Sequence, residues 1–214
     1  MKLYSMPHSP YASRVRIQIY HKNLDIEILD PPGLREGTFS DIVPTAQVPA
    51  LDTGATVLAE SNVIMDYLED IHPSKPMRPV DPEARAITSL LMRVADVRIA
   101  PALFPLFKEV MVKSGDQQAI TDNIVALKAQ LKLLDELFQF YGYKARDLSL
   151  ADAALVPTIY FCLQVPGWFG EKDMLAGLDT LSAWWQWAQQ QDAVAKVLLE
   201  IDEGLQVMLA RLNA

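Results

Sequence analysis

The chain has 214 residues, half of them hydrophobic, which is enough for one large hydrophobic core or two modest ones. Its formal net charge of −8 and the absence of a basic cluster in the sequence argue against a nucleic-acid partner and against an anionic membrane surface. The one cysteine, Cys162, excludes an internal disulfide, and the sequence has neither a signal-peptide pattern nor an apolar run near the ~20 residues of a membrane span, so we expect a cytoplasmic protein.

The first stretch, Lys2 to Tyr20, is expected to form a short strand, a tight turn and an amphipathic helix. Ser9 followed by Pro10 predicts the helix start, because serine accepts a hydrogen bond from first-turn amides and proline is tolerated at the first helical position. Ser9 therefore has a hydroxyl at the positive end of a helix dipole, where an anion is stabilised. The alternative is that Ser9 only caps its helix.

The following elements continue an alternating pattern. Residues 25–29 alternate polar and apolar side chains and predict a half-buried strand, and residues 34–43 predict a short helix or an irregular loop. Residues 48–51 and 56–58 predict a hairpin, and Ser61 begins a helix with one apolar face. This order of strand, helix, strand, hairpin and helix is thioredoxin-like.

A proline-rich segment then marks a domain boundary. Residues 72–82 hold four prolines without helical periodicity, so we expect an exposed, extended linker. The predicted fold is α+β: a thioredoxin-like N-terminal domain with a mixed four-stranded sheet, followed by an all-helical bundle as the C-terminal domain. We place the two domains at residues 1–76 and 83–214, with the linker at 77–82.

The C-terminal domain is predicted to contain only helices. A long helix over residues 83–113 should kink or break midway, at Pro101 and Pro105. Ser149 and Asp152 form a capping-box-like pattern at the start of another helix. The remaining predicted helices are an amphipathic one over residues 117–141, one that contains three tryptophans, and a last one over residues 194–212.

Two short motifs of the N-terminal domain suit a ligand. In Gln47-Val48-Pro49 the proline opens a strand and cannot donate to a ladder, so it belongs at an edge or a bend, the alternative being a simple strand start. In Glu60-Ser61 an N-cap serine with exposed helix amides suits a carboxylate, and the adjacent acid suits an ammonium group. The alternative for this motif is an ordinary helix cap.

Taken together, these motifs resemble a known family. The segment SPYASRVR, residues 9–16, resembles the N-terminal signature of glutathione transferases of zeta and omega type, where an active-site serine or cysteine lies five residues before the first arginine of an R-x-R pair. Ser9, Arg14 and Arg16 fall on this pattern, and the resemblance covers essentially the whole chain. It implies glutathione as cosubstrate, a homodimer, no metal, and Ser9 as the hydrogen-bond donor that stabilises the glutathione thiolate.

The resemblance also implies which residues hold glutathione. Pro49 should follow a cis peptide bond, so that the backbone of Val48 pairs with the cysteinyl part of glutathione as a short strand addition. Gln47 would lie beside the glycine end of glutathione. Glu60 and Ser61 would hold the ammonium and carboxylate groups of the γ-glutamyl end.

Further assignments rest on position along the chain. Arg35 is the candidate for the glycyl carboxylate of glutathione. Tyr4 is the alternative to Ser9 as the hydrogen-bond donor to the glutathione thiolate. Cys162 is interpreted as a buried structural thiol in an apolar helix. The residues expected to line the acceptor site are His8, Tyr11, Arg98, Phe104, Phe107, Met111 and Trp168.

The expected reaction is attack of the glutathione thiolate on an electrophilic carbon of a small, mostly apolar substrate, by addition, substitution, or ether or halide displacement. Position 9 is serine where the omega type has cysteine, so disulfide exchange lacks its attacking thiol. Residues 150–170 contain no arginine or lysine to hold a dicarboxylate, which argues against a maleylacetoacetate isomerase. The alternative function is a non-catalytic protein-interaction module of the stringent-starvation type.

Overall fold

The computed structural model describes residues 1–143 and 147–212, and the chain divides into two compact units. Unit 1 combines Met1–Pro79 with Asp192–Ala214, and unit 2 is Val80–Gln191. The expected α+β fold class is confirmed, because unit 1 contains a mixed sheet with helices and unit 2 is built from helices.

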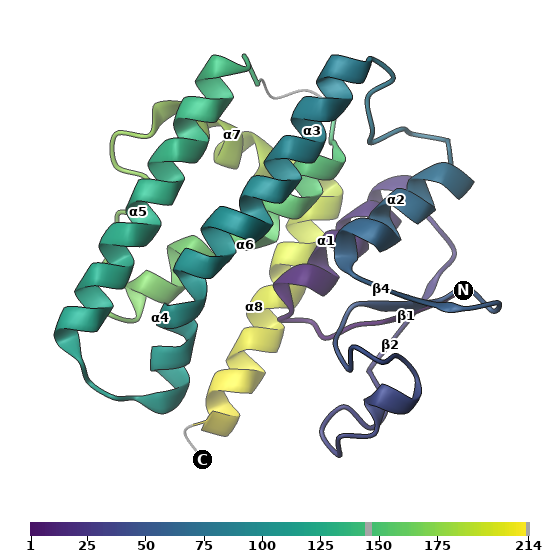
Figure 1. Ribbon diagram of the computed structural model, residues 1–214, viewed down its shortest axis with the longest axis horizontal. Helices are drawn as coiled ribbons and strands as arrows, with labels where there is room; N and C mark the ends of the chain where they lie inside the picture. The colour runs from purple at the N-terminus through teal and green to yellow at the C-terminus, as the bar shows by residue number, and fades with distance from the viewer. Residues whose placement is uncertain (144–146, 213–214) are drawn as a thin grey trace. The chain divides into compact units, whose positions relative to one another are not determined.

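Unit 1 contains a four-stranded sheet in the order β2-β1-β3-β4 (Figure 1). Its strands are β1 (Lys2–Tyr4), β2 (Glu27–Leu29), β3 (Ala50–Asp52) and β4 (Val57–Ala59). β1 pairs in parallel with β2 and antiparallel with β3, and β3 pairs antiparallel with β4. The sheet therefore has the expected thioredoxin-like order, with β2 at one edge. A short 3-10 helix, η1 (Phe39–Asp41), lies in the loop between β2 and β3.

Three helices belong to the same unit: α1 (Pro10–Lys22), α2 (Ser61–Ile71) and α8 (Asp192–Leu212). α1 lies between α2 and α8 and contacts both (Figure 1). Every residue from Ala12 to Ile19 is buried, although the sequence predicts only one apolar face. The neighbours on both sides also cover the polar residues of α1, so these residues must find hydrogen-bond partners inside the fold.

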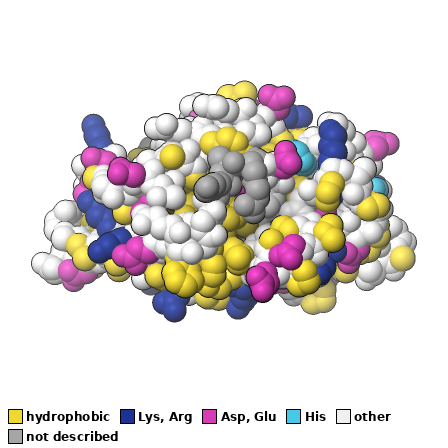
Figure 2. Space-filling view, turned by 90° about the horizontal axis from the view of Figure 1, so that it is seen from above, with side chains coloured by type: hydrophobic (Ala, Val, Ile, Leu, Met, Phe, Trp, Pro, Cys, Tyr) yellow, Lys and Arg dark blue, Asp and Glu magenta, His cyan; other side chains and the backbone are white. Residues whose placement is uncertain are grey.

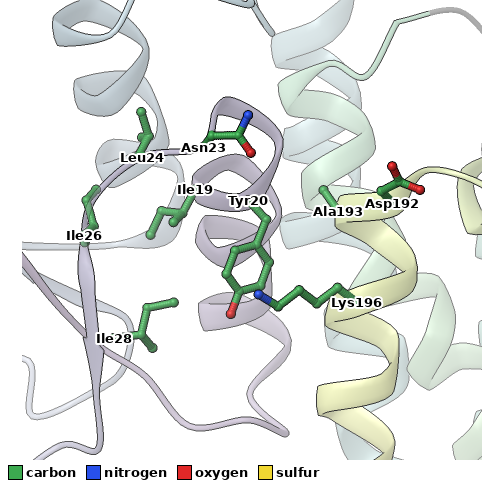
Figure 3. Close-up of a pocket in the computed structure, with 9 residues that line it drawn as sticks. All are labelled: Ile19, Tyr20, Asn23, Leu24, Ile26, Ile28, Asp192, Ala193 and Lys196. Atoms are coloured by element: carbon green, nitrogen blue, oxygen red, sulfur yellow. The ribbon is translucent and has the colours of Figure 1, made fainter.

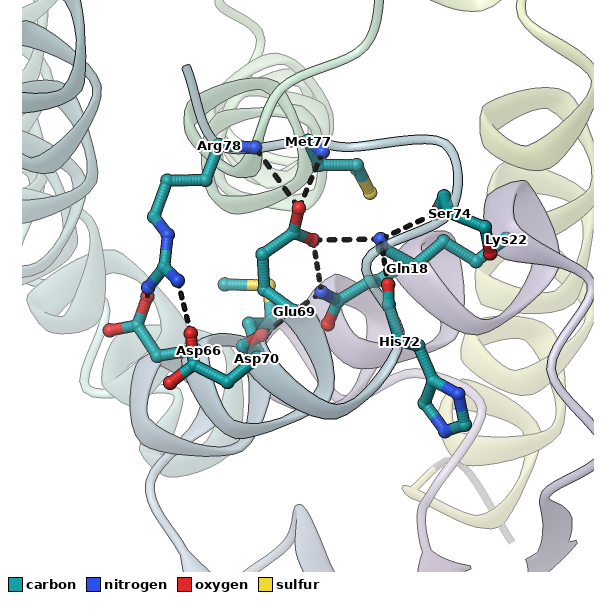
Figure 4. A network of polar contacts seen from close by, with 10 residues as sticks. Gln18, Lys22, Asp66, Glu69, Asp70, His72, Ser74, Met77 and Arg78 are labelled. Atoms are coloured by element: carbon teal, nitrogen blue, oxygen red, sulfur yellow. Dashed lines mark hydrogen bonds and ion pairs between the residues drawn. The ribbon is translucent and has the colours of Figure 1, made fainter. Parts of the chain in front are cut away.

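A buried ion pair closes the C-terminal end of α1 (Figure 4). Lys22 Nζ lies 3.0 Å from Glu69 Oε2 of α2, and both side chains are buried. Lys22 Nζ also donates to the carbonyls of His72, at 2.7 Å, and Ser74, at 2.9 Å. An ammonium has three N–H groups, so these three acceptors satisfy the buried charge.

The same network fixes the segment after α2, which the sequence predicts to be exposed and extended. Glu69 Oε1 accepts a hydrogen bond from the Met77 amide at 2.8 Å, and Met77 is only 1% exposed. Gln18 Nε2 of α1 donates to the carbonyl of Met65 at 2.9 Å. Most of residues 72–82 are exposed, as the sequence predicts, but the buried side chain of Met77 anchors the segment in the core, which a high proline content does not reveal.

Unit 2 is helical in its described residues, with α3 (Pro82–Val94), the π-helix η2 (Ala95–Ile99), α4 (Ala100–Val112), α5 (Gln117–Phe140), α6 (Leu150–Gly167) and α7 (Asp179–Gln189). The helical domain expected at 83–214 also included α8, which groups with unit 1 instead. Near Pro101 the chain stays helical through η2 rather than breaking. Proline lacks an N–H and its ring crowds the carbonyl four residues back, so a wider helical turn just before it accommodates the ring.

α6 is the core helix of unit 2. It begins with a capping box in which Ser149 Oγ accepts from the Asp152 amide and the Asp152 carboxylate accepts from the Ser149 amide, as the sequence predicts. Asp152 Oδ1 also accepts from Tyr143 Oη and Trp184 Nε1, each at 2.8 Å. Contrary to expectation, this 18-residue helix is long and apolar enough to cross a membrane by length and composition, but 83% of it is buried inside the protein, as in a core helix.

The surface has charges of both signs. On the face shown in Figure 2, Lys and Arg side chains of the described residues are interspersed with Asp and Glu. This agrees with the sequence, where 27 acidic residues outnumber 19 basic ones without a cluster of either sign. The expectation that neither nucleic acid nor a membrane is a partner stays a prediction.

Candidate active site

The three motifs singled out in the sequence start from neighbouring strand ends in unit 1. Tyr4, the last residue of β1, pairs with Ala50, the first residue of β3. Ala50 pairs in turn with Ala59, the last residue of β4. The loop after β1, the residues just before β3 and the connection after β4 therefore all lie at the same end of the sheet.

Ser9 ends the loop after β1 and caps α1. Its backbone is extended, with φ −78° and ψ 119°, and its Oγ accepts a hydrogen bond from the Ala12 amide at 3.2 Å. The side chain is partly exposed. The cap bond uses a lone pair of the oxygen, so the O–H group can still donate to an anion placed at the helix N-terminus.

Arg16 holds the loop that leads to Ser9. Its Nη1 donates to Ser5 Oγ and to the Met6 carbonyl, both at 3.1 Å, and its Nη2 donates to the Pro7 carbonyl at 2.6 Å. Its Nε lies 3.1 Å from Glu200 Oε2 on α8. Burial lowers the pKa of Arg16 and the Glu200 carboxylate opposes this effect. The second arginine of the R-x-R pair is thus a positioning residue for the loop.

The other aromatic and basic residues of this region pack locally. The Arg14 guanidinium lies over the Tyr11 ring, 4.6 Å from its centroid, and Arg14 is only 1% exposed. The Tyr4 ring packs edge-on against Phe39, with centroids 5.7 Å apart, in a hydrophobic cluster beside β3. A tyrosine packed in this way contributes to the core, which favours Ser9 over Tyr4 as the residue expected to donate a hydrogen bond to the thiolate.

The residues before β3 offer an unpaired backbone. The Val48–Pro49 peptide bond is cis, as the family resemblance implies, and Pro49 is buried while Gln47 is exposed. Within residues 1–143 and 147–212, neither the amide nor the carbonyl of Val48 has a hydrogen-bond partner. Val48 therefore presents one donor and one acceptor to an extended peptide backbone.

The connection after β4 differs from the sequence prediction. Ser61 is the first residue of α2 rather than its N-cap, and it is only 5% exposed. Glu60 occupies the N-cap position, with φ 67° and ψ 117°, and in the described structure its side chain does not cap the helix. A single residue must reverse the chain between β4 and α2, which explains a positive φ that non-glycine residues rarely adopt. The first-turn amides of a helix without a side-chain cap suit a carboxylate.

His8 and Arg35 line one cleft of unit 1, with a volume of about 930 Å³. The cleft lies between the loop after β1, the loop after β2 and the C-terminal half of α8, which contributes Arg211. Burial, followed by the charges of Arg16, Arg211 and Arg35, lowers the pKa of His8. The sequence analysis did not predict that Arg211 lines this cleft. In the sequence, Arg211 is only a basic residue in the last turn of a predicted helix, which does not indicate a site.

Apart from His8 and Tyr11, the residues predicted for the acceptor site belong to unit 2. Phe104 and Met111 are exposed on α4, at 43% and 57%, and Arg98 is exposed on η2. The Phe107 ring packs against Phe161, with centroids 5.2 Å apart, and Trp168 is the C-cap of α6. Their assignment to an acceptor site stays a prediction. Cys162 is fully buried and burial raises the pKa of its thiol, which agrees with a structural role.

Comparison with known proteins identifies the family. Residues 3–76 match the family model described as glutathione S-transferase, N-terminal domain. Glutathione S-transferase Z2 of Arabidopsis thaliana is 34% identical over 170 residues, which are 75% of each chain. A probable maleylacetoacetate isomerase of Caenorhabditis elegans is 32% identical over 74% of this chain and 77% of its own.

Two further comparisons bear on function and on fold. A stringent starvation protein A homolog of Coxiella burnetii is 31% identical over 163 residues, 75% of each chain. The crystal structure of glutathione transferase F7 from Populus trichocarpa has a TM-score of 0.79 and 27% identity, and covers 94% of this chain and 98% of that one. Two relatives are more than 30% identical over about three quarters of their length, and residues 3–76 match the family model, so the chain belongs to the glutathione S-transferase family.

Proposed function

We propose that this family member activates the thiolate of glutathione for attack on an electrophilic carbon of a small substrate. The observation that carries the proposal is the strand register, which brings the Ser9 loop, Val48 and the start of α2 to one end of the sheet. A hydroxyl at a helix start, an unpaired backbone segment and an uncapped helix start match the three chemical parts of one tripeptide.

Each part of glutathione has a proposed place. The γ-glutamyl carboxylate binds the first-turn amides of α2. The exposed Glu60 lies beside them, and its carboxylate accepts a hydrogen bond from the γ-glutamyl ammonium group. The cysteinyl backbone pairs with the amide and carbonyl of Val48, next to Gln47. The sulfur then lies at the Ser9 hydroxyl. Arg35, exposed on the loop after β2, is the proposed partner of the glycyl carboxylate.

The reaction requires a lowered thiol pKa. A thiol with a pKa near 8.5 is only a few per cent ionised at neutral pH, and lowering it by about 2 units needs about 2.7 kcal/mol of preferential stabilisation of the thiolate. The Ser9 O–H and the N-terminal end of α1 act on the same atom and can supply this energy. Ser9 thus donates a hydrogen bond, and the nucleophile is the glutathione sulfur.

The electrophile is proposed to enter the cleft that His8 lines. Met6, Leu34 and Val207 give this cleft apolar walls. The lowered pKa of His8 keeps its imidazole neutral at neutral pH, so it can exchange hydrogen bonds with a polar group of the substrate. From the family we also propose a cytoplasmic homodimer.

Two alternatives have support of their own. One relative is named a maleylacetoacetate isomerase, and Arg35 with Arg211 in the cleft could hold a carboxylate. The lack of basic residues in 150–170 does not argue against this role, because most side chains of α6 are buried in the core. The other alternative, a non-catalytic interaction module, is favoured by the stringent starvation relative.

Titration calorimetry with glutathione tests the proposal against the interaction module. We expect saturable binding in the micromolar to millimolar range, and weaker binding for Glu60→Gln, which removes the carboxylate that holds the ammonium group. No heat of binding at several millimolar glutathione would refute the enzyme assignment. A panel of electrophiles with glutathione, including a cis-dicarboxylate for isomerisation, read by mass spectrometry, then separates conjugation from isomerisation.

A further inference from the structure

The last helix of the chain, α8, has a glycine in its interior that packs against the loop after β1. Glycine is a poor helix former, so Gly204 does not help the helix to form. A Cβ atom at Gly204 would lie 2.7 Å from Pro7 Cβ and 2.9 Å from the backbone nitrogen of His8, whereas ordinary van der Waals contacts are 3.4–4 Å long. Glycine therefore permits a close approach between α8 and this loop that a side chain would prevent.

The residues next to Gly204 form a tight turn directly before Ser9. The Ser9 amide donates to the Met6 carbonyl at 3.0 Å, which closes a four-residue turn with Pro7 and His8 at its centre. Proline suits the first central position of such a turn, because its ring fixes φ near the required value. His8 is bonded to Ser9, the cap of α1, so a displacement of the turn passes to Ser9 through one peptide bond.

The position of α8 against α1 is fixed one and two helical turns before Gly204. Lys196, Glu200 and Gly204 follow one another at intervals of four residues, so they share one face of α8. The Lys196 ammonium group lies over the ring of Tyr20 of α1, 3.7 Å from its centroid (Figure 3). The Tyr20 hydroxyl donates to Glu200 Oε1 at 2.7 Å. The face of α8 that contacts the turn is thus the face that holds α1.

A larger side chain at this position would displace the turn rather than the helix. α8 is anchored in the core by Val197, Ile201 and Leu205, which are at most 6% exposed, whereas Pro7 is exposed. To lengthen the closest separation from 2.7 Å to an ordinary contact of 3.4 Å, the turn would move by roughly 0.7 Å. A displacement of this size at Ser9 is large enough to weaken a hydrogen bond from its hydroxyl.

We propose that Gly204 is a positioning residue for thiolate activation. The bare backbone of α8 at Gly204 lets the turn of residues 6–9 lie where the Ser9 hydroxyl can donate to the glutathione sulfur. This inference rests on the proposed function, in which Ser9 stabilises the thiolate. Gly204 acts through Pro7 and His8, so its effect falls on the position of Ser9 and leaves Val48 and the start of α2 unchanged.

Gly204→Ala tests this role through the pKa of the thiol of bound glutathione, read by thiolate absorbance on the full chain without an electrophile. From a wild-type value of about 6.5, we expect the thiol pKa to rise by about 1, because the hydrogen bond to the sulfur is weakened. Turnover at pH 7 should then fall about threefold, and the difference should vanish near pH 9, where the thiol is ionised in both proteins. The KM for glutathione should change less than about twofold, since the contacts remote from the sulfur remain.

Gly167→Ala is the matched control, because it makes the same substitution in another helix, α6. Among the described residues, a Cβ atom at Gly167 would meet nothing within 4 Å. The control should therefore keep the wild-type thiol pKa and the wild-type pH dependence of turnover. A rise in thiol pKa as large as that of Gly204→Ala would overturn the proposal, because it would show that the effect does not depend on contact with the turn.

The measurements separate this inference from the proposed function. A wild-type thiol pKa in Gly204→Ala would overturn the positioning role alone, whereas a wild-type protein that does not lower the thiol pKa would refute the proposed function and the positioning role with it. If circular dichroism shows that Gly204→Ala does not fold, the comparison is made in a Pro7→Gly background, which removes the nearest atom and leaves the His8 nitrogen at 2.9 Å. The thiol pKa should then be higher in the double variant than in Pro7→Gly, and equal values would overturn the proposal.

Discussion

Replacing Lys22 with methionine should destabilise unit 1 strongly. The substitution keeps an unbranched apolar stem of similar length but removes the cation 3.0 Å from Glu69 Oε2. The carboxylate keeps its bond from the Met77 amide, yet it stays buried without a counter-ion. Breaking one partner out of a buried pair costs about 3–5 kcal/mol, a large part of the 5–15 kcal/mol that stabilises a typical domain. The orphaned carbonyl of Ser74 adds little, because Ser74 is exposed and water can bind it.

Urea unfolding followed by two probes measures this effect. All four tryptophans lie in unit 2, so their fluorescence reports that unit, whereas circular dichroism reports the helices of both. The matched control is Arg78→Met, which removes a partly exposed cation paired with the exposed Asp66 and Asp70 beside the same network. Surface pairs contribute about 0–1 kcal/mol, so the control should stay near wild type. A loss below about 1 kcal/mol for Lys22→Met would show that the buried pair is not a determinant of stability.

Three other substitutions test the candidate site. Ser9→Ala should cost about 1 kcal/mol of stability through the lost cap, raise the pKa of the bound glutathione thiol in thiolate absorbance, and lower turnover at neutral pH; unchanged turnover and thiol pKa would reduce Ser9 to a cap. Glu60→Gly should raise stability by about 1 kcal/mol, because glycine adopts the positive φ without strain, and should also raise the KM for glutathione. Glu60→Gln should raise the KM without changing stability. An unchanged KM in both variants would exclude contact between Glu60 and the ammonium group of glutathione. In the wild type, the lowered pKa of His8 makes the folded state bind fewer protons than the unfolded state, so stability falls as pH falls below about 6.5. His8→Gln should therefore flatten the pH dependence of the unfolding free energy between about pH 7 and about pH 5. The same slope in wild type and variant would contradict this.

Local signals in the sequence account for the correct parts of the site. The cap by Ser9 depends on neighbours within three residues, and so does the capping box at Ser149, which makes both readable from the sequence. The prediction that Ser61 is the N-cap of α2 was wrong by one residue, because Glu60 occupies that position. Serine is the commoner cap, but the direct passage from β4 into the helix forces Glu60 into the cap position, and only the strand pairing shows where β4 ends.

Long-range partners account for the parts that the sequence could not predict. The polar face of α1 looks like a solvated face in sequence, because Lys22 and Arg16 have no acidic residue at helical spacing on α1. Their partners, Glu69 and Glu200, lie 47 and 184 positions further along the chain, on helices that cover α1 from two sides. Arg211 was missed for the same reason, since the loops that form its cleft come from the other end of the sequence.

The spacing of the serine and arginine motif has a physical basis in this structure. Arg16 lies seven residues after Ser9, about two helical turns into α1, and side chains on a helix lean toward its N-terminus. A long side chain at this position therefore reaches back over the first turn, to the carbonyls of Met6 and Pro7 just before the cap. A guanidinium suits this place better than an ammonium, because its planar fork can bond several acceptors at once. The forked side chain thus anchors the loop on which the position of the Ser9 hydroxyl depends, which explains why an arginine two turns away belongs to the same motif as the serine.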